Sequence, residues 1–306
     1  MAIPTSRAKD AAQILLLPEL CNGCGHCVQV CGDNNLEILN GKVQLTDAPL
    51  FGCIGCGHCM LICPNDAIRI DGRTLSVDDV FPLPEKETAT DYNSLLHLLQ
   101  RRRSIREFTK KEIPDELVNK IIEAAQTAPM GLPPSDVHLV VLRNRDKVRE
   151  FSFDYCSFLK SMRWFVSDWF MTIMRPFWGK SNDEMFRGFV KPLFDTYIGS
   201  MEKGENLVTY DAPLAIYFYG SPYTDPADPI IAATYAMLAG ESLGLGTCML
   251  GGVHPLIQNG KKAKKFRENW GIKFPSREGL IVVFGYPAVK YKKGVRRTFA
   301  DVKIIE

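Results

Sequence analysis

The chain has 306 residues, of which 46% are hydrophobic and 24% charged, and its formal net charge is +2. This length and composition are typical of a globular protein that buries a full core and holds two domains of unequal size. The charge balance does not suggest nucleic-acid binding, since the basic runs at 101–103 and 261–265 come with no recognisable binding motif.

Two copies of one cysteine pattern lie near the start of the chain, 32 residues apart. Three thiolates spaced two residues apart wrap one [4Fe-4S] cubane, and in two-cluster proteins the fourth cysteine of each run binds the other cluster. The pattern therefore predicts two [4Fe-4S] clusters. The predicted ligands are Cys21, Cys24, Cys27 and Cys63 for one cluster, and Cys53, Cys56, Cys59 and Cys31 for the other.

Two other interpretations of the cysteines are weaker. Zinc sites use two C-x-x-C pairs rather than two runs of four, and a disulfide framework needs a secreted context. His26 and His58 occupy equivalent places in the two copies, but thiolates already fill every coordination position, so both histidines are expected on the solvent side. Around these ligands the chain resembles the bacterial-type ferredoxins, except that Gly32 stands where the second copy has Pro64.

The segment at 81–87 predicts a domain boundary, because paired prolines and charges follow the last part of the cluster domain. The first domain, 1–84, carries a net charge of −4 and the second, 85–306, a net charge of +6. This asymmetry favours electrostatic docking of the two domains, or of an external electron carrier. Residues 1–10 show no secretory signal, and a cytoplasmic location is expected.

The second domain shows an α+β pattern. The expected elements are a helix at 92–102 capped by Asp91, a helix opened by Pro114 and Asp115, strands at 137–142, 214–219 and 280–284, and a helix at 229–243. Gly244 and Gly246 are interpreted as a continuation of the last helix, and they lack the third glycine of a dinucleotide-binding fingerprint. No separate nicotinamide-binding domain is expected.

The stretch 151–206 is rich in large apolar side chains, including Trp164, Trp169 and Trp178. Its uncharged portions fall short of the ~20 residues that span a bilayer, so no membrane span is expected. Three interpretations stay open: helices that wall a pocket or a dimer interface, ordinary added core, and an in-plane membrane contact. As a pocket wall, the stretch would suit a flat aromatic or quinone-like substrate.

Arg102, Arg103 and Ser104 lie where the first expected helix ends, and such a cluster can surround a phosphate with charge-assisted hydrogen bonds. Further segments follow in order at 124–129, 244–252 and 283–287, and then Lys293, Arg296 and Arg297. This succession resembles the nitroreductase family of FMN proteins over about residues 90–306. The whole chain is similar to the ferredoxin-fused nitroreductases, which implies a three-layer α/β/α fold with a central antiparallel sheet after a small ferredoxin-like domain.

The resemblance also implies roles for particular residues. Arg102, Arg103 and Ser104 would hold the FMN phosphate and ribityl chain, and Arg296 or Arg297 would complete the phosphate site. Lys293 is a further expected cofactor-binding residue. The backbone of Gly251 and Gly252 would approach flavin N5 and O4, a contact that a side chain would block. The family's FMN lies at the interface of an intertwined homodimer, in which the segment 302–305 would be a swapped strand.

The loop after Ala128 departs from the family pattern. The family places a serine, an asparagine and a glutamine there, whereas this chain has Pro133 at the asparagine's place. The flavin contacts expected of this loop therefore come from backbone groups or from Ser135, and Pro129 and Met130 are the other residues of the loop expected at the cofactor. Cys248 lies in the glycine-rich segment near the expected flavin and is interpreted as a small buried thiol.

Joining the two halves predicts an enzyme that converts single-electron input into two-electron chemistry. An external low-potential donor would reduce the clusters, the clusters would pass electrons to FMN, and FMN would deliver hydride to a nitroaromatic, quinone or activated alkene acceptor. NAD(P)H is a further candidate donor. Two alternatives stay open: an electron-transfer or redox-sensing module that relays electrons to a protein partner, and a reversed flow in which substrate is oxidised at FMN.

Overall fold

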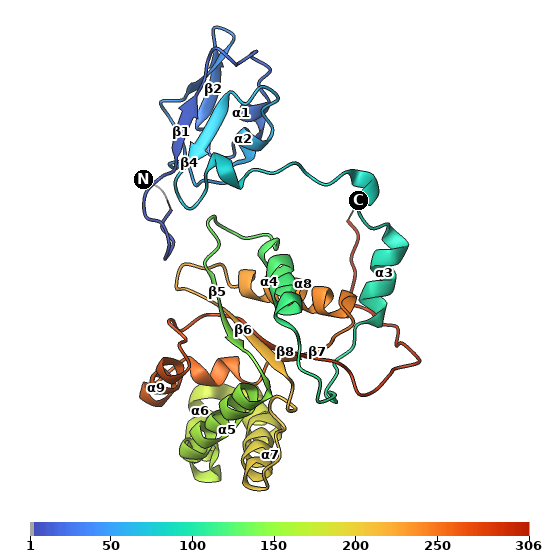
Figure 1. Ribbon diagram of the computed structural model, residues 1–306. Coiled ribbons are helices and arrows are strands. Elements are labelled where there is room, and N and C mark those ends of the chain that lie inside the picture. The colour runs from blue at the N-terminus through green and yellow to red at the C-terminus, as the bar shows by residue number, and fades with distance from the viewer. Residues whose placement is uncertain (1–2, 306) are drawn as a thin grey trace.

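The computed structural model describes residues 3–305, which form a small N-terminal part and a larger part, at the top and bottom of Figure 1. The elements of the small part are β1 Gln13–Leu16, α1 His26–Val30, β2 Leu36–Leu39, β3 Lys42–Leu45, α2 His58–Leu61 and β4 Ile68–Asp71. Strand β1 pairs antiparallel with β4, and β2 pairs antiparallel with β3. The first and last strands of the small part therefore lie together.

The two short helices of the small part are built in the same way. Gly25 and Gly57 precede α1 and α2 with φ angles of 78° and 75°, a left-handed conformation that glycine adopts without steric cost. Each helix then buries one cysteine, Cys27 in α1 and Cys59 in α2. These cysteines share a small core with Ile68 and other apolar residues of the strands, so the motif and the core of this part are one structure.

The connection between the two parts is exposed. It contains two short 3-10 helices, η1 Val77–Asp79 and η2 Lys86–Thr88. Phe81 and Leu83 have exposed fractions of 69% and 84%, which are high for large apolar side chains. The boundary predicted between residues 84 and 85 falls inside this exposed segment.

The larger part is a four-stranded sheet between two layers of helices. Its elements are α3 Tyr92–Arg101, α4 Asp115–Gln126, β5 Val137–Leu142, α5 Arg145–Ser161, η3 Arg163–Val166, α6 Asp168–Met185, η4 Phe186–Val190, α7 Lys191–Glu202, β6 Leu214–Gly220, α8 Asp228–Ser242, β7 Gly246–Leu250, η5 His254–Ile257, α9 Lys261–Asn269 and β8 Gly279–Gly285. The strand order is β5-β6-β8-β7, and all neighbours are antiparallel. This confirms the predicted α/β/α fold with a central antiparallel sheet.

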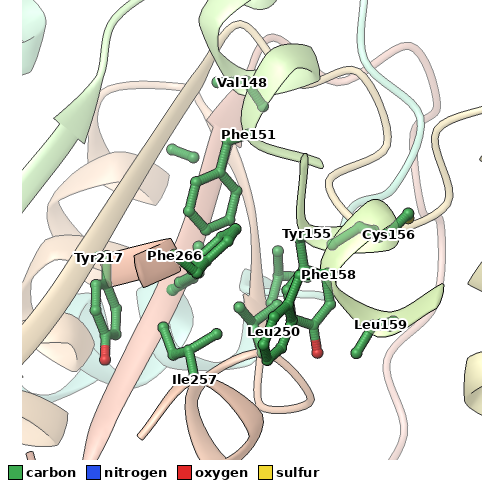
Figure 2. Close-up of a cluster of buried hydrophobic side chains, with 14 of the residues drawn as sticks. Val148, Phe151, Tyr155, Cys156, Phe158, Leu159, Tyr217, Leu250, Ile257 and Phe266 are labelled. Carbon is green, nitrogen blue, oxygen red and sulfur yellow. The ribbon is translucent and has the colours of Figure 1, made fainter. Parts of the chain in front are cut away.

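The alternation of side chains along the buried strands creates the two cores. On β6, Leu214, Ile216 and Phe218 face α4 and α8, whereas Tyr217 and Tyr219 face the other layer of helices. Figure 2 shows this second core, where Phe151 and Tyr155 of α5 meet Phe266 of α9. Both faces of the sheet are therefore covered.

The predicted elements agree closely with the structure, with one error. The helices at 92–102 and 229–243 and the helix opened by Pro114 and Asp115 are confirmed as α3, α8 and α4, and the three strands are confirmed as β5, β6 and β8. The interpretation of Gly244 and Gly246 as helical was wrong. Helix α8 ends at Ser242, Gly244 turns the chain with a φ of 78°, and Gly246 begins β7, an edge strand that pairs with β8.

The aromatic-rich stretch 151–206 begins inside α5, and much of it is ordinary core. Phe151, Tyr155 and Phe194 are almost fully buried against the sheet. Helix α6 is different, because it leaves Trp169 and Phe177 exposed to 61% and 80%. Within residues 3–305, no helix combines the length and the apolar character needed to cross a membrane.

A close contact at the start of β7 gives a first prediction, on Gly246. A Cβ atom added there would lie 2.7 Å from Cγ1 of Ile105, which is 6% exposed. Gly246→Ala should therefore lower the free energy of unfolding by about 1–3 kcal/mol, as overpacking does. Urea unfolding of the wild type and of Gly246→Ala tests this prediction. The matched Gly199→Ala, where a Cβ meets no atom within 4 Å, should leave stability unchanged or slightly higher; equal effects of the two changes would contradict the prediction.

Candidate functional site

The first predicted cysteine set lines one cavity. Cys21, Cys24, Cys27 and Cys63 all border it, although Cys63 comes from the second run. Burial raises the pKa of the Cys27 thiol, and Cys63 and Cys21 are the thiols that interact with it electrostatically. The fold therefore brings the fourth cysteine of the second run to the first run.

The second set shows the same crossing. Cys59 interacts electrostatically with Cys53, Cys31 and Cys56, and burial raises its pKa to about 12. Such a thiol is protonated and unreactive at neutral pH unless a metal replaces its proton. Cys31 of the first run thus lies with the three cysteines of the second.

Backbone N–H groups point at several of these sulfurs. Gly23 and Val43 donate to Cys21 Sγ, both over 3.4 Å, and Ala67 donates to Cys63 Sγ over 3.2 Å. Such hydrogen bonds favour the thiolate form that a cluster requires. His26 and His58 are exposed, as predicted. Among residues 3–305 no group of three His, Cys, Asp or Glu residues is arranged to hold a single metal ion. The four thiols of the first set instead surround a cavity.

The basic segment after α3 runs along β7. Arg102 ends α3 in an extended conformation, Ser104 forms a parallel bridge with Thr247, and Ile105 N donates to Thr247 O over 2.9 Å. Alternation in an extended segment puts Arg102 and Ser104 on one side and Arg103 on the other. The thiol of Cys248 lies near this side. Burial raises its pKa, while Arg106, Ser104 and Arg102 all act on the thiol to lower it.

Arg103 lies against the C-terminal arm. A Cβ on Gly294 would be 2.7 Å from Arg103 Nη2, so the arm carries Lys293 past this guanidinium. In the described part of the chain no carboxylate forms an ion pair with Arg102, Arg103 or Lys293, whereas Arg101 pairs with Glu241 over 3.7 Å. Positive side chains without a carboxylate partner are free to bind an anion.

The glycines after β7 border an open face. A Cβ on Gly251 would meet no atom within 4 Å, and one on Gly252 would meet only Leu193 of α7, at 3.7 Å. Tyr155 of α5 donates its hydroxyl to Gly252 O over 3.0 Å. The aromatic-rich stretch therefore supports and borders this glycine segment, in addition to its role in the core.

Comparison with known families decides what this fold and site belong to. The model described as the nitroreductase family matches residues 99–286, more than half of the chain. The chain belongs to the nitroreductase family. A second model, described as a 4Fe-4S dicluster domain, matches residues 13–64 and so covers all eight motif cysteines.

 This match takes in the complete predicted ligand set.

Solved nitroreductases share the fold of the larger part. An FMN-bound nitroreductase from Bacteroides fragilis is 21% identical, with a TM-score of 0.51, and the match covers 71% of this chain and 100% of that one. An FMN-bound nitroreductase from Desulfitobacterium hafniense is 22% identical, with the same TM-score and the same coverage. At this level of identity the similarity shows the fold alone.

Curated relatives match over short segments. A Methanothermobacter thermautotrophicus protein, named provisionally as an NADH dehydrogenase/NAD(P)H nitroreductase, is 36% identical over 56 residues, or 18% of this chain and 29% of that protein. Iodotyrosine deiodinase 1 of Sus scrofa is 34% identical over 70 residues, or 22% of this chain and 24% of that protein. The matched segments span less than a third of either relative.

The nitroreductase domain of one chain does not bring all the predicted flavin residues together. Pro129, Met130 and Ser135 lie before β5, at one edge of the sheet, whereas Gly251 and Gly252 follow β7 at the other edge. Strands β6 and β8 lie between, so the two groups are roughly 14 Å apart across the sheet. A single-chain site therefore holds the arginines and glycines without this loop.

Sequence reasoning missed part of the basic segment of this nitroreductase. Arg106 lies 5.8 Å above the Tyr210 ring, and its pKa is raised first by Cys248 and then by Tyr210. A signal was available, because Arg106 follows Ser104 by two residues and an extended segment places both on the same side. Lys293 is brought close to Arg103 by the arm, while Arg296 and Arg297 are exposed further along it.

Proposed function

We propose that this nitroreductase-family protein is an FMN-dependent oxidoreductase that receives single electrons through two [4Fe-4S] clusters. FMN, when bound, supplies hydride transfer to a nitroaromatic, quinone or activated alkene acceptor. The observation that carries the proposal lies at the two ends of β7. Around its start, Arg102, Arg103 and Lys293 have no carboxylate partner in the described chain, and the open glycine face follows its end.

The chain's own residues have separable tasks in this proposal. Arg102 and Ser104 bind the phosphate from one side of the extended segment, and the arm beside Arg103 adds further positive charge. Gly251 lets the backbone approach the flavin ring, and Tyr155 holds the adjacent carbonyl in place. The two crossed cysteine sets hold the clusters.

A homodimer is part of the proposal. Helix α3 has no buried residue, and the C-terminal arm leaves Phe299, Ile304 and Ile305 exposed to more than 80%. The predicted strand at 302–305 is not formed within the described chain. Exposed apolar arms of this kind are covered by a second copy in intertwined dimers, which would also bring the loop with Pro129, Met130 and Ser135 of one copy to the flavin of the other. A cytoplasmic location and an external low-potential donor, with NAD(P)H as a candidate, complete the proposal.

Anaerobic purification followed by acceptor assays tests this function. The protein should contain iron and released FMN, and dithionite should bleach the flavin band. Adding a nitroarene or a quinone should restore that band with conversion of the acceptor. A flavin that is reduced but reacts with no small acceptor would contradict the reductase and favour a relay to a protein partner.

Gly251 provides a site-specific prediction. Gly251→Ala should leave the free energy of unfolding unchanged, because its Cβ meets no protein atom within 4 Å. It should weaken FMN binding by about tenfold, since the new methyl group keeps the backbone from the flavin ring; this corresponds to about 1.4 kcal/mol. Isothermal titration of the apoprotein with FMN measures the change. Unchanged affinity would show that Gly251 does not face the flavin.

A further inference from the structure

The small part of the chain is fastened to the nitroreductase domain by hydrogen bonds from Ser6, Arg7 and Arg73. Ser6 N donates to Asp136 Oδ2 over 2.8 Å, and Ser6 Oγ donates to the other oxygen of the same carboxylate. Arg7 Nη1 donates to Ser135 O over 3.0 Å. Figure 1 shows this N-terminal segment on the side of the small part that faces the rest of the chain.

Arg73 forms the second half of this junction. Its guanidinium donates to four backbone carbonyls: Ile54 O over 2.9 Å, Asp10 O over 3.0 Å, Ile3 O over 3.0 Å and Pro133 O over 2.8 Å. The residue is only 6% exposed. A buried charge that is satisfied entirely by carbonyls from separate segments fixes the relative positions of those segments.

The carbonyl partners show which cysteine set lies at the junction. Ile54 follows Cys53 directly, and a Cβ on Gly55 would lie 3.2 Å from Arg73 Cβ. Ala12, two residues beyond Asp10, donates to Cys53 O over 2.9 Å. The loop that carries Cys53 and Cys56 is therefore bonded through one side chain to Pro133. The loop of Cys21 is bonded instead to Lys42 and Asn65, within the small part.

The receiving loop is built to hold its shape. Asp136 is 3% exposed and also accepts a hydrogen bond from Ser221 Oγ, while Thr224 Oγ1 donates to Asp136 O over 2.9 Å. Burial opposes ionisation of this carboxyl, but the hydrogen bonds from Ser221 and Ser6 keep its pKa below the usual value. The anchor for Ser6 is thus a fixed, ionised carboxylate at the start of β5.

We propose that Arg73 is a positioning residue that holds the second cysteine set, Cys53, Cys56, Cys59 and Cys31, against the loop at 133–136, so that this set exchanges electrons with the flavin. The inference rests on the proposed function, in which this loop borders the flavin of the second copy in the homodimer. An external one-electron reductant donates electrons one at a time, and each electron passes through this cysteine set. Two such electrons, with protons from water, would reduce the flavin. Arg73 itself undergoes no chemical change.

The test compares three variants of the full holoprotein. Arg73→Met keeps the aliphatic stem without the donors, and Ser6→Ala weakens the other anchor. Arg69→Met is the control, because Arg69 is an exposed arginine on β4, the strand that ends two residues before Arg73. Iron content, flavin content, amide hydrogen exchange at 3–10 and 133–136, and the separate rates of cluster and flavin bleaching by dithionite are measured for each.

Arg73→Met should keep its iron and flavin and increase amide exchange in both segments. Flavin bleaching should become about tenfold slower or more, while cluster bleaching stays unchanged. The reason is that steps that depend on position are sensitive to displacements of about 1 Å. Ser6→Ala should change both readouts in the same direction, and Arg69→Met neither. Unchanged exchange and unchanged flavin bleaching in Arg73→Met overturn the inference.

Two further outcomes keep the inference distinct from the proposed function. If Arg73→Met loses iron, Ser6→Ala decides, and unchanged exchange and flavin bleaching in that variant overturn the inference. The Cys27→Ala and Cys31→Ala double variant should lack both clusters. If its flavin is reduced at the wild-type rate, the proposed electron path fails, and the electron-transfer part of the inference fails with it. The amide exchange readout still decides whether Arg73 fastens the two parts.

Discussion

Cys31→Ala should remove the second cluster and leave the first, although Cys31 belongs to the first run of cysteines. Iron should fall from about eight to about four per chain, the content of one cubane. The reason is geometric, because Cys31 lies with Cys59 and Cys53 while Cys63 lies with Cys27. Iron analysis of the anaerobically purified variant measures the effect.

Pairs of substitutions separate the crossed arrangement from an uncrossed one. Cys31→Ala combined with Cys59→Ala should cost no more iron than either change alone, since both residues serve one cluster. Cys31→Ala combined with Cys27→Ala should remove nearly all the iron. The opposite pattern, with the second pair behaving like a single change, would show that each run holds its own cluster.

Arg102→Ala should weaken FMN binding by about 10- to 100-fold, since a hydrogen bond to a charged group contributes about 1.5–3 kcal/mol. Arg102 lies on the same side of the extended segment as Ser104, near Arg106, and no described carboxylate forms an ion pair with it. Titration of the apoprotein with FMN, followed by flavin fluorescence, gives the dissociation constants.

Riboflavin, which lacks the phosphate, provides the internal control for this prediction. Its affinity should be nearly the same for the wild type and for Arg102→Ala. The neighbouring Arg101→Ala should leave FMN affinity unchanged, because Arg101 is 78% exposed and pairs with Glu241 instead. An equal loss of FMN and riboflavin affinity in Arg102→Ala would place the phosphate elsewhere.

The cysteine motif and the apolar strands were predictable because each is a local pattern with one physical meaning. Cysteines at fixed spacing allow few structures, and the fully buried strands β6 and β8 read as continuous apolar runs. Strand β7 was missed because it begins with a glycine, Gly246, only two residues after Gly244, and the turn at Gly244 was interpreted as part of α8. Its edge position depends on pairing with β8, which no local pattern contains.

The junction between the two parts could not be predicted from the sequence. Ser6, Arg73 and Asp136 are far apart in the chain, and none belongs to a motif. Arg73 would have been interpreted as a surface arginine, since its four acceptors are backbone carbonyls that carry no sequence signature. Such contacts become visible only when the fold has brought the segments together.

The departure of the loop from the family pattern acquires a physical explanation here. Pro133 offers a carbonyl to Arg73, Ser135 offers one to Arg7, and Asp136 binds Ser6. Where the family pattern has an asparagine, this chain therefore has Pro133, whose carbonyl binds the small part. Changes in this loop are therefore expected to affect electron delivery as well as flavin contacts.

A reductive titration tests the central claim, that the clusters and the flavin form one electron-transfer unit, most directly. Stepwise addition of dithionite to the anaerobic protein should consume about four electrons per chain, one for each cluster and two for FMN, and later additions of an acceptor should reoxidise all three centres together. Two results would contradict the account. One is a consumption of about two electrons per chain with no flavin band, and the other is a flavin that stays oxidised while the clusters are reduced.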